Sequence, residues 1–145
     1  MKVICLQIHA KYYQHQYEGD VNLTTIQLKR IYEEPAKNDG SRILVDRLWP
    51  RGIKKEEAAL DYWLKEIGPS NELRQAFHHE NLSFRTFKEK YIQQLKTGKQ
   101  KEAYETLISI VAEEKRVTLL FAAKNETENQ AVVLKEMLER DLGGV

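Results

Sequence analysis

The chain has 145 residues, of which 41% are hydrophobic and 31% charged, and its 23 basic and 22 acidic side chains leave a formal net charge of +1. These values predict one globular domain over residues 1–145 and exclude an intrinsically disordered chain. The balanced charge excludes a globally basic nucleic-acid binder. Because the sequence has no long apolar run and no secretory signal pattern, we expect a cytoplasmic protein with no membrane partner.

Residues 1–23 indicate an N-terminal extension made of a strand and a polar aromatic loop. β-Branched residues predict the strand at 3–8, where an apolar environment disfavours the reactive thiolate form of Cys5, the single cysteine. The tyrosines at 12, 13 and 17 suit an arm packed on this domain or on a second subunit, and they also suit a nucleic-acid face.

Three further strands are predicted at residues 24–32, 43–45 and 117–122, each a compact apolar or β-branched run. Residues 33–41 form a turn because Pro35, Asn38, Asp39 and Gly40 supply turn chemistry.

Helical spacing predicts the other elements. A first helix uses the apolar positions 59, 60, 63, 64 and 67 and ends at Gly68. Ser70 can cap a second helix that turns positions 73 and 77 inward. Apolar stripes at 84–95 and 103–111 predict two more, and Thr127 with Gln130 forms a capping box before a last helix.

This order predicts an α/β fold with a small central sheet of three to four mostly parallel strands and helices packed on it. The segment 117–138 has the strand-loop-helix form that faces a ligand crevice in such folds. If the strand at 43–45 runs parallel to the strand at 117–122, both following loops open at one edge. This geometry would bring together Arg47, Arg51 and Lys124.

The loop Asp46-Arg47-Leu48-Trp49-Pro50-Arg51-Gly52 holds the strongest candidate site. Two guanidinium groups repel unless an anion or a carboxylate lies between them, so Arg47, Arg51 and Lys124 are candidate anion-binding residues. Asp46 would orient an arginine or act as a base. The alternative is an internal Arg–Asp brace that fixes the loop.

Trp49 would wall this pocket or belong to the core. Three further arginines are second-rank pocket candidates: Arg30, Arg42 and Arg74. The four histidines have no metal-ligand spacing, so we expect no metal and no cofactor, although His78 or His79 would suit a general base if it bordered the loop. No catalytic residue is assigned.

The sequence resembles a known family, the YeaO-like branch of domain of unknown function 488. The motifs that carry the resemblance are residues 27–32, residues 38–52 with the Asp-Arg-Leu-Trp-Pro-Arg-Gly string, residues 63–70 and 72–74, Phe87, Tyr91 and residues 118–124. The resemblance covers roughly residues 24–140 and implies a small cytoplasmic prokaryotic α/β domain without supplying an activity. Some relatives carry a cysteine near the strand at 117–122. Phe121 and Ala122 stand there in this chain, which argues against cysteine chemistry.

Three hypotheses of function stay open, and whether the protein is an enzyme stays open with them. The first is a binding or catalytic pocket for a small anionic ligand such as phosphate or a nucleotide. The second is a nucleic-acid-binding or regulatory module, weakly favoured by eight basic against six acidic side chains in residues 24–60. The third is a non-catalytic interaction protein, such as a homodimer, whose arginine loop is structural.

Overall fold

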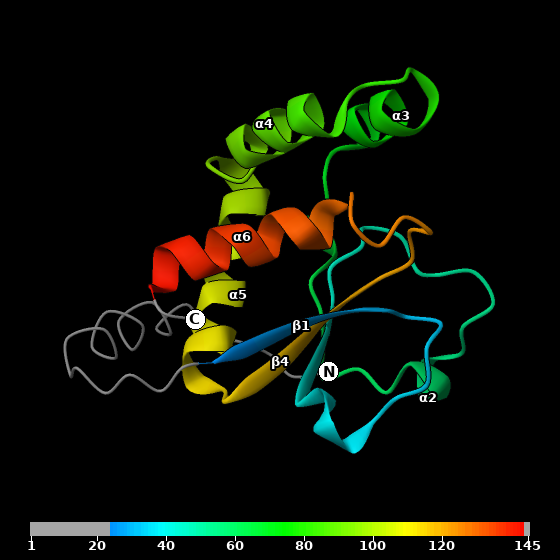
Figure 1. Ribbon diagram of the computed structural model, residues 1–145, viewed down its shortest axis with the longest axis vertical. Helices are drawn as coiled ribbons and strands as arrows, with labels where there is room; N and C mark the ends of the chain where they lie inside the picture. The colour runs from blue at the N-terminus through cyan, green and yellow to red at the C-terminus, as the bar shows by residue number, and fades with distance from the viewer. Residues whose placement is uncertain (1–23, 144–145) are drawn as a thin grey trace.

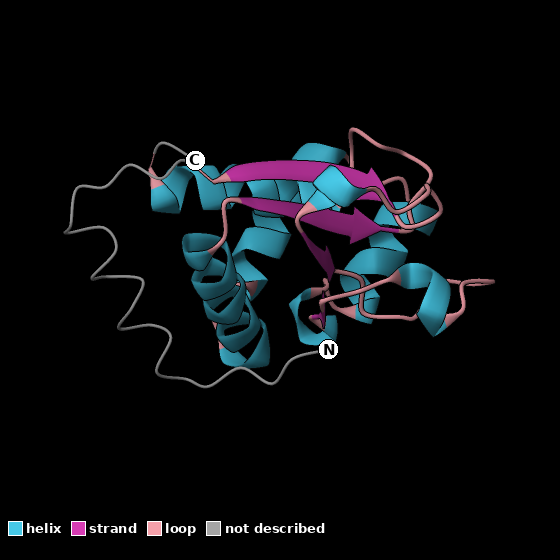
Figure 2. Ribbon diagram, turned by 90° about the horizontal axis from the view of Figure 1, so that it is seen from below, coloured by secondary structure: helices cyan, strands magenta, loops and turns pink. Residues whose placement is uncertain are grey.

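The computed structural model describes residues 24–143 and contains a four-stranded sheet with helices packed on it (Figure 1). The strands are β1 (Thr25–Arg30), β2 (Ser41–Leu44), β3 (Tyr62–Trp63) and β4 (Arg116–Phe121), in the order β1-β4-β2-β3. All pairings are parallel, and the arrows of the longer strands point the same way in Figure 2. The predicted α/β fold with a small, mostly parallel sheet is confirmed. The strand, loop and cysteine predictions for residues 1–23 lie outside the described residues.

Strand β4 forms the centre of the sheet because its side chains are apolar on both faces. Val117, Leu119 and Leu120 are fully buried, and β1 and β2 pair with β4 on either side. A continuous apolar run of this kind is typical of parallel strands, which are covered on both faces. The strand predictions at 24–32, 43–45 and 117–122 are therefore confirmed, with ends shifted by one or two residues.

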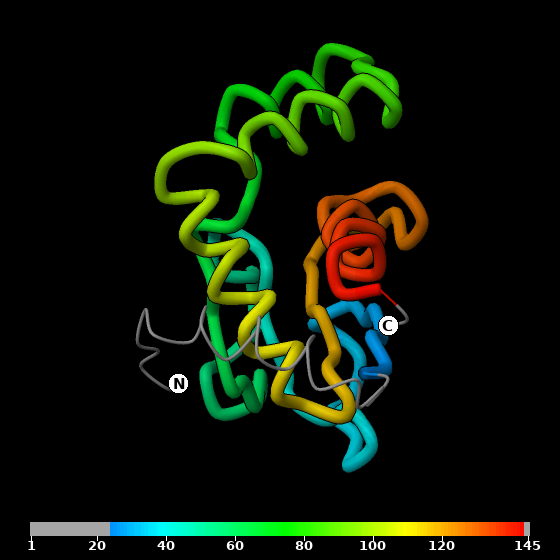
Figure 3. The backbone as a smooth tube through the Cα atoms, turned by 90° about the vertical axis from the view of Figure 1, so that its left-hand side faces the viewer, coloured from blue at the N-terminus to red at the C-terminus, as the bar shows by residue number. Residues whose placement is uncertain are grey.

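Seven helical segments complete the described chain. They are η1 (Lys37–Asp39), α2 (Lys55–Ala58), η2 (Lys65–Ile67), α3 (Asn71–His79), α4 (Phe84–Gln94), α5 (Gly98–Glu113) and α6 (Gln130–Leu142). Helices α5 and α6 pack beside the sheet, whereas α3 and α4 lie side by side at the top of Figures 1 and 3. Ser70 caps α3 as predicted, since its Oγ accepts a hydrogen bond from Leu73 N at 3.1 Å.

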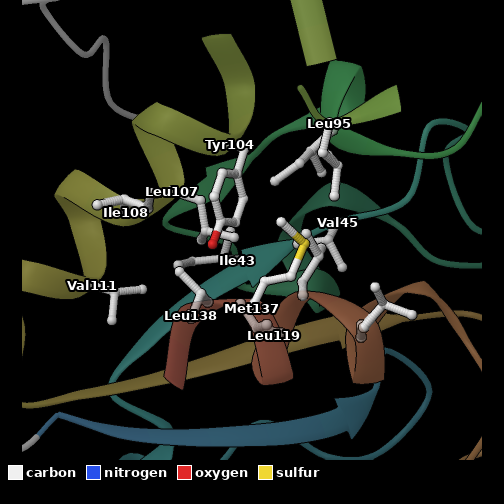
Figure 4. Close-up of a cluster of buried hydrophobic side chains, with 14 of the residues drawn as sticks. Ile43, Val45, Leu95, Tyr104, Leu107, Ile108, Val111, Leu119, Met137 and Leu138 are labelled. Atoms are coloured by element: carbon white, nitrogen blue, oxygen red, sulfur yellow. The ribbon is translucent and has the colours of Figure 1, made fainter. Parts of the chain in front are cut away.

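The main core lies between the sheet and α3 to α6. Figure 4 shows Ile43 and Leu119 of the sheet facing Leu107 and Val111 of α5 and Leu138 of α6. A smaller cluster covers the other face of the sheet and contains Ile31, Leu44, Ala58 and Leu120, packed by both tryptophans. Within residues 24–143 this second face is covered by short segments, whereas the long helices α3 to α6 lie on the face of the main core.

The predicted helix over residues 59–67 is wrong. Ala59 adopts a left-handed conformation with φ 48°, which ends α2, and the chain then forms β3 against β2. Asp61 fixes this pairing through its backbone and its side chain. Its N donates to Arg42 O at 2.9 Å, and its Oδ2 accepts from Arg42 N at 2.9 Å. The helical spacing of apolar residues instead serves two faces: Leu60 and Trp63 pack on the smaller cluster, and Leu64 and Ile67 belong to the main core. Strand pairing therefore overrides the local pattern.

The start of α6 also differs from the predicted capping box. Asn129 is the capping residue, and its Oδ1 accepts from Val132 N at 3.1 Å. Thr127 lies earlier, in a turn where Asn125 Oδ1 accepts from the N atoms of Thr127 and Glu128, each at 3.0 Å. The predicted helix is present, but Gln130 is its first residue, and the side chain that caps it is that of Asn129.

Candidate functional site

A pocket of about 330 Å³ opens at the carboxyl edge of the sheet. Its walls come from the loops after β2 and β4, the start of α6, helix α3 and Phe87 of α4. The two loops meet here because β2 and β4 run parallel, and this edge is where open α/β sheets bind ligands. The volume is at the small end of the range for ligand-binding pockets.

Asp46 lines the pocket from the loop that follows β2. Its Oδ2 accepts from Ala122 N at 2.9 Å, and its Oδ1 accepts from Gln130 Nε2. Burial raises the pKa of Asp46 to about 6, because the hydrogen bonds from Ala122 and Gln130 and the charge of Arg74 offset the desolvation only in part. The carboxyl group is therefore ionised at pH 7 at a cost to the folded state.

Arg74 of α3 faces the same pocket with an incompletely satisfied guanidinium group. Its Nε is buried without a hydrogen-bond partner in the described chain, and one terminal nitrogen makes a long contact of 3.4 Å with Asn71 Oδ1. Its charge acts on Asp46, yet the ion pairs found between residues 24 and 143 do not join the two side chains. Buried donors without partners are rare in folded proteins and call for an explanation.

The remaining wall is largely aromatic and apolar. Phe77 and Phe87 stack with ring centroids 4.4 Å apart, and Leu48 keeps 56% of its surface exposed at the rim. Desolvation, followed by the charges of Arg74 and His79, lowers the pKa of His78, so its imidazole is neutral at pH 7. The pocket thus combines an apolar wall with charged groups of both signs.

The structure brings Arg47 and Lys124 into the pocket lining and leaves Arg51 outside it. The guanidinium of Arg47 donates to Gly68 O at 2.7 Å and Pro69 O at 3.2 Å, and it pairs with Glu66 at 3.4 Å. Its donors thereby hold the loop after η2 against the loop after β2. Arg51 is exposed, as is Lys124. The anion-binding role of these three residues stays a prediction.

Two expected pocket residues donate their hydrogen bonds to backbone carbonyl groups. Arg30 donates to Ala122 O and Ala123 O, each at 2.9 Å. Trp49 donates from Nε1 to Ile53 O at 2.7 Å and packs edge-on against Trp63. Neither side chain lines the pocket, whereas Asp46 and Arg74 both do.

Arg42 is buried and serves a polar cluster at the opposite end of β2. It pairs with Asp39 at 2.5 Å and donates to Ala58 O and Ala59 O, and Lys29 pairs with the same carboxylate at 3.2 Å. A strand rises about 3.3 Å per residue, so Arg42 lies roughly 13 Å from Asp46 along the chain. The distance explains why sharing a sheet face does not bring Arg42 into the pocket.

Three contributors to the pocket were missed by sequence reasoning. Gln130 was predicted only as part of a capping box, and Phe77 and Phe87 only as core positions. The signal for Gln130 was its place at the first turn of the helix after the central strand, the region that faces the crevice in α/β folds.

No helix among residues 24–143 is both long and apolar enough to cross a bilayer. The same stretch holds no group of three or more His, Cys, Asp or Glu side chains placed to ligate a metal.

The fold and pocket define a small α/β protein with a crevice at the carboxyl edge of a parallel sheet. Residues 25–144 match the model of the family DUF488-N3i, described as the inactive DUF488-N3 subclade, and the chain belongs to this family. The predicted family resemblance is confirmed. The chain is 50% identical over 113 residues to the Escherichia coli protein named "Uncharacterized protein YeaO", covering 78% of this chain and 96% of that protein.

Proteins of Mycobacterium bovis and Mycobacterium tuberculosis, also named as uncharacterised, are 40% identical over 75 residues, which is 52% of this chain and 64% of each of those proteins. No solved structure is significantly similar to this chain.

Proposed function

We propose that this protein binds a small anionic ligand in the pocket at the carboxyl ends of β2 and β4, with Arg74 as the main contact to the anion. The observation that carries the proposal is the buried Arg74 Nε, which has no hydrogen-bond partner within residues 24–143. A guanidinium binds carboxylate or phosphate oxygens through paired N–H donors, so an anion would satisfy the group that the protein leaves unsatisfied.

The surroundings of Arg74 support this assignment. Lys124 follows β4 and adds a second positive charge at the rim. Arg47 adds a third positive charge, although its donors bind Gly68 and Pro69. Because the stacked Phe77 and Phe87 lower the local dielectric, an ion in the pocket would interact more strongly than in bulk water.

Binding without chemical turnover is the form of the function that we favour. The family is described as inactive, and the neutral His78 and the hydrogen-bonded Asp46 form no nucleophile–base pair. Nothing in this arrangement requires a cofactor.

The test is a titration of the purified full chain with inorganic phosphate, 3-phenylpropanoate and L-phenylalanine at constant ionic strength. Thermal shift and isothermal calorimetry would detect saturable binding of at least one of these three compounds, each of which carries a phosphate or carboxylate group. Arg74→Ala should weaken it at least tenfold. Arg51→Ala removes the same charge from an exposed position outside the pocket, so it should leave binding unchanged. Equal binding by the Arg74→Ala variant, or no saturable binding to any of the probes, would overturn the proposal.

A further inference from the structure

The pocket holds two opposite charges that do not pair with each other. Asp46 and Arg74 line the same cavity of about 330 Å³, and the charge of Arg74 acts on the Asp46 carboxylate. Partly buried charges cost free energy unless they are paired, and a direct ion pair would be the simplest solution. Asp46 and Arg74 do not form such an ion pair. Gln130 and Ala122 donate to the carboxylate of Asp46, and Arg74 Nε has no partner in the described chain.

From this arrangement we infer that the ligand is a small zwitterion of the α-amino-acid type with an apolar side chain, bound with its carboxylate at Arg74 and its ammonium group at Asp46. The inference rests on the proposed function and extends it by adding a cation subsite. A ligand that bridges Asp46 and Arg74 satisfies both charges at once, which neither a simple anion nor a simple cation can do.

Asp46 has the acceptor capacity that this role needs. Each carboxylate oxygen can accept two hydrogen bonds, and each accepts one from the protein, from Gln130 at Oδ1 and from Ala122 at Oδ2. The two protein donors fix the plane of the carboxylate and leave one acceptor position on each oxygen for an ammonium group. The desolvation of Asp46 gives it a further reason to favour a cation, because an opposite charge stabilises the ionised form.

The apolar wall indicates the nature of the side chain. Phe77, Phe87 and Pro69 line the cavity, and the exposed Leu48 stands at its rim. An aliphatic or aromatic side chain would bury apolar surface against these residues, at roughly 25 cal/mol per Å². A free inorganic anion would leave this part of the pocket without a contact.

The experiment compares matched ligands that differ only in the ammonium group. L-Phenylalanine and L-leucine are titrated against 3-phenylpropanoate and 4-methylpentanoate by isothermal calorimetry at about pH 7.5. Each amino acid should bind at least tenfold more tightly than its deaminated partner. Asp46→Asn keeps the size and the acceptor for Ala122 N, and it should abolish that preference. Because it removes a negative charge beside the bound carboxylate, the deaminated acids should bind to the variant at least as tightly as to the wild-type protein.

Proton release gives a second readout that a structural role for Asp46 would not produce. At about pH 6, binding of the ammonium group should release part of a proton from the wild-type protein, measured in buffers of different ionisation enthalpy, and none from Asp46→Asn. The other titratable groups that line the pocket remain in both proteins: Arg47, Arg74, His78, Lys124 and Glu128.

The outcomes separate this inference from the proposed function. If the deaminated acids bind as tightly as the amino acids and Arg74→Ala abolishes both, the zwitterion inference is wrong and the anion site stands. If no member of the set, phosphate included, binds in a way that depends on Arg74, both fail.

Discussion

Asp46→Asn should make this protein more stable at neutral pH, although it alters a hydrogen-bonded residue. Burial holds the pKa of Asp46 at about 6 against an ordinary value of 3.8. Between these two values the folded state binds a proton that the unfolded state has lost, so the contribution of Asp46 to stability falls as the pH rises from about 4 to 6. Above that range the ionised group costs about 3 kcal/mol.

Asparagine carries no charge at any of these pH values and retains an oxygen that accepts from Ala122 N. The Gln130 amide can turn to offer its own oxygen to the new amide group. Because the pocket is partly open to water, we expect the substitution to recover somewhat less than the full cost of about 3 kcal/mol for ionising the buried carboxyl group. The difference in unfolding free energy between variant and wild type should change by about 2 kcal/mol in favour of the variant between about pH 4 and pH 7.5.

Urea unfolding followed by the fluorescence of Trp49 and Trp63 measures this difference directly. Glu128→Gln is the matched control, since it removes an exposed carboxyl group from the same pocket and should change stability by less than about 0.5 kcal/mol at either pH. If the difference in unfolding free energy between Asp46→Asn and wild type does not change with pH, or if the variant is equally destabilised at both pH values, the carboxylate carries no desolvation cost. A residue that lowers stability in this way is characteristic of a functional site.

Two further predictions concern the other end of the sheet. Burial alone would raise the pKa of Asp39, but hydrogen bonds from Ala36, Lys29 and Arg42 hold it below its ordinary value. Asp39→Asn should therefore destabilise by about 3 kcal/mol at pH 7, and calorimetry should show the difference shrinking as the pH falls through the lowered pKa. Gly40→Ala should prevent stable folding, because at φ +66° the added Cβ would lie 2.1 Å from a β4 carbonyl oxygen. Gly52→Ala is the control: its φ is +77° with open space around it, so the substitution should lower the free energy of unfolding by only about 1 kcal/mol. Similar melting temperatures for the two variants would refute the argument.

The sequence alone determined the elements whose local signals agree. The apolar runs fixed β1, β2 and β4, and the stripe around Phe87 and Tyr91 fixed α4, since periodicity and capping are properties of neighbouring residues. The Ser70 cap is another case, because donor and acceptor are three residues apart. The same information placed the candidate site at the loops after the two central strands, which a parallel sheet must open at one edge.

Tertiary structure decided everything that depends on distant partners. The segment around Trp63 has helical spacing but forms β3, because Asp61 and β2 satisfy its backbone. The sequence left Arg47 open as an anion-binding residue or as part of an internal brace. In the structure its guanidinium donates to carbonyl groups about 20 residues away, so it braces a loop. Arg74 was a second-rank pocket candidate in the sequence, and folding leaves its Nε buried without a hydrogen-bond partner in the described chain. A guanidinium group becomes available to a ligand only when folding leaves its donors without protein acceptors, and no local pattern encodes that.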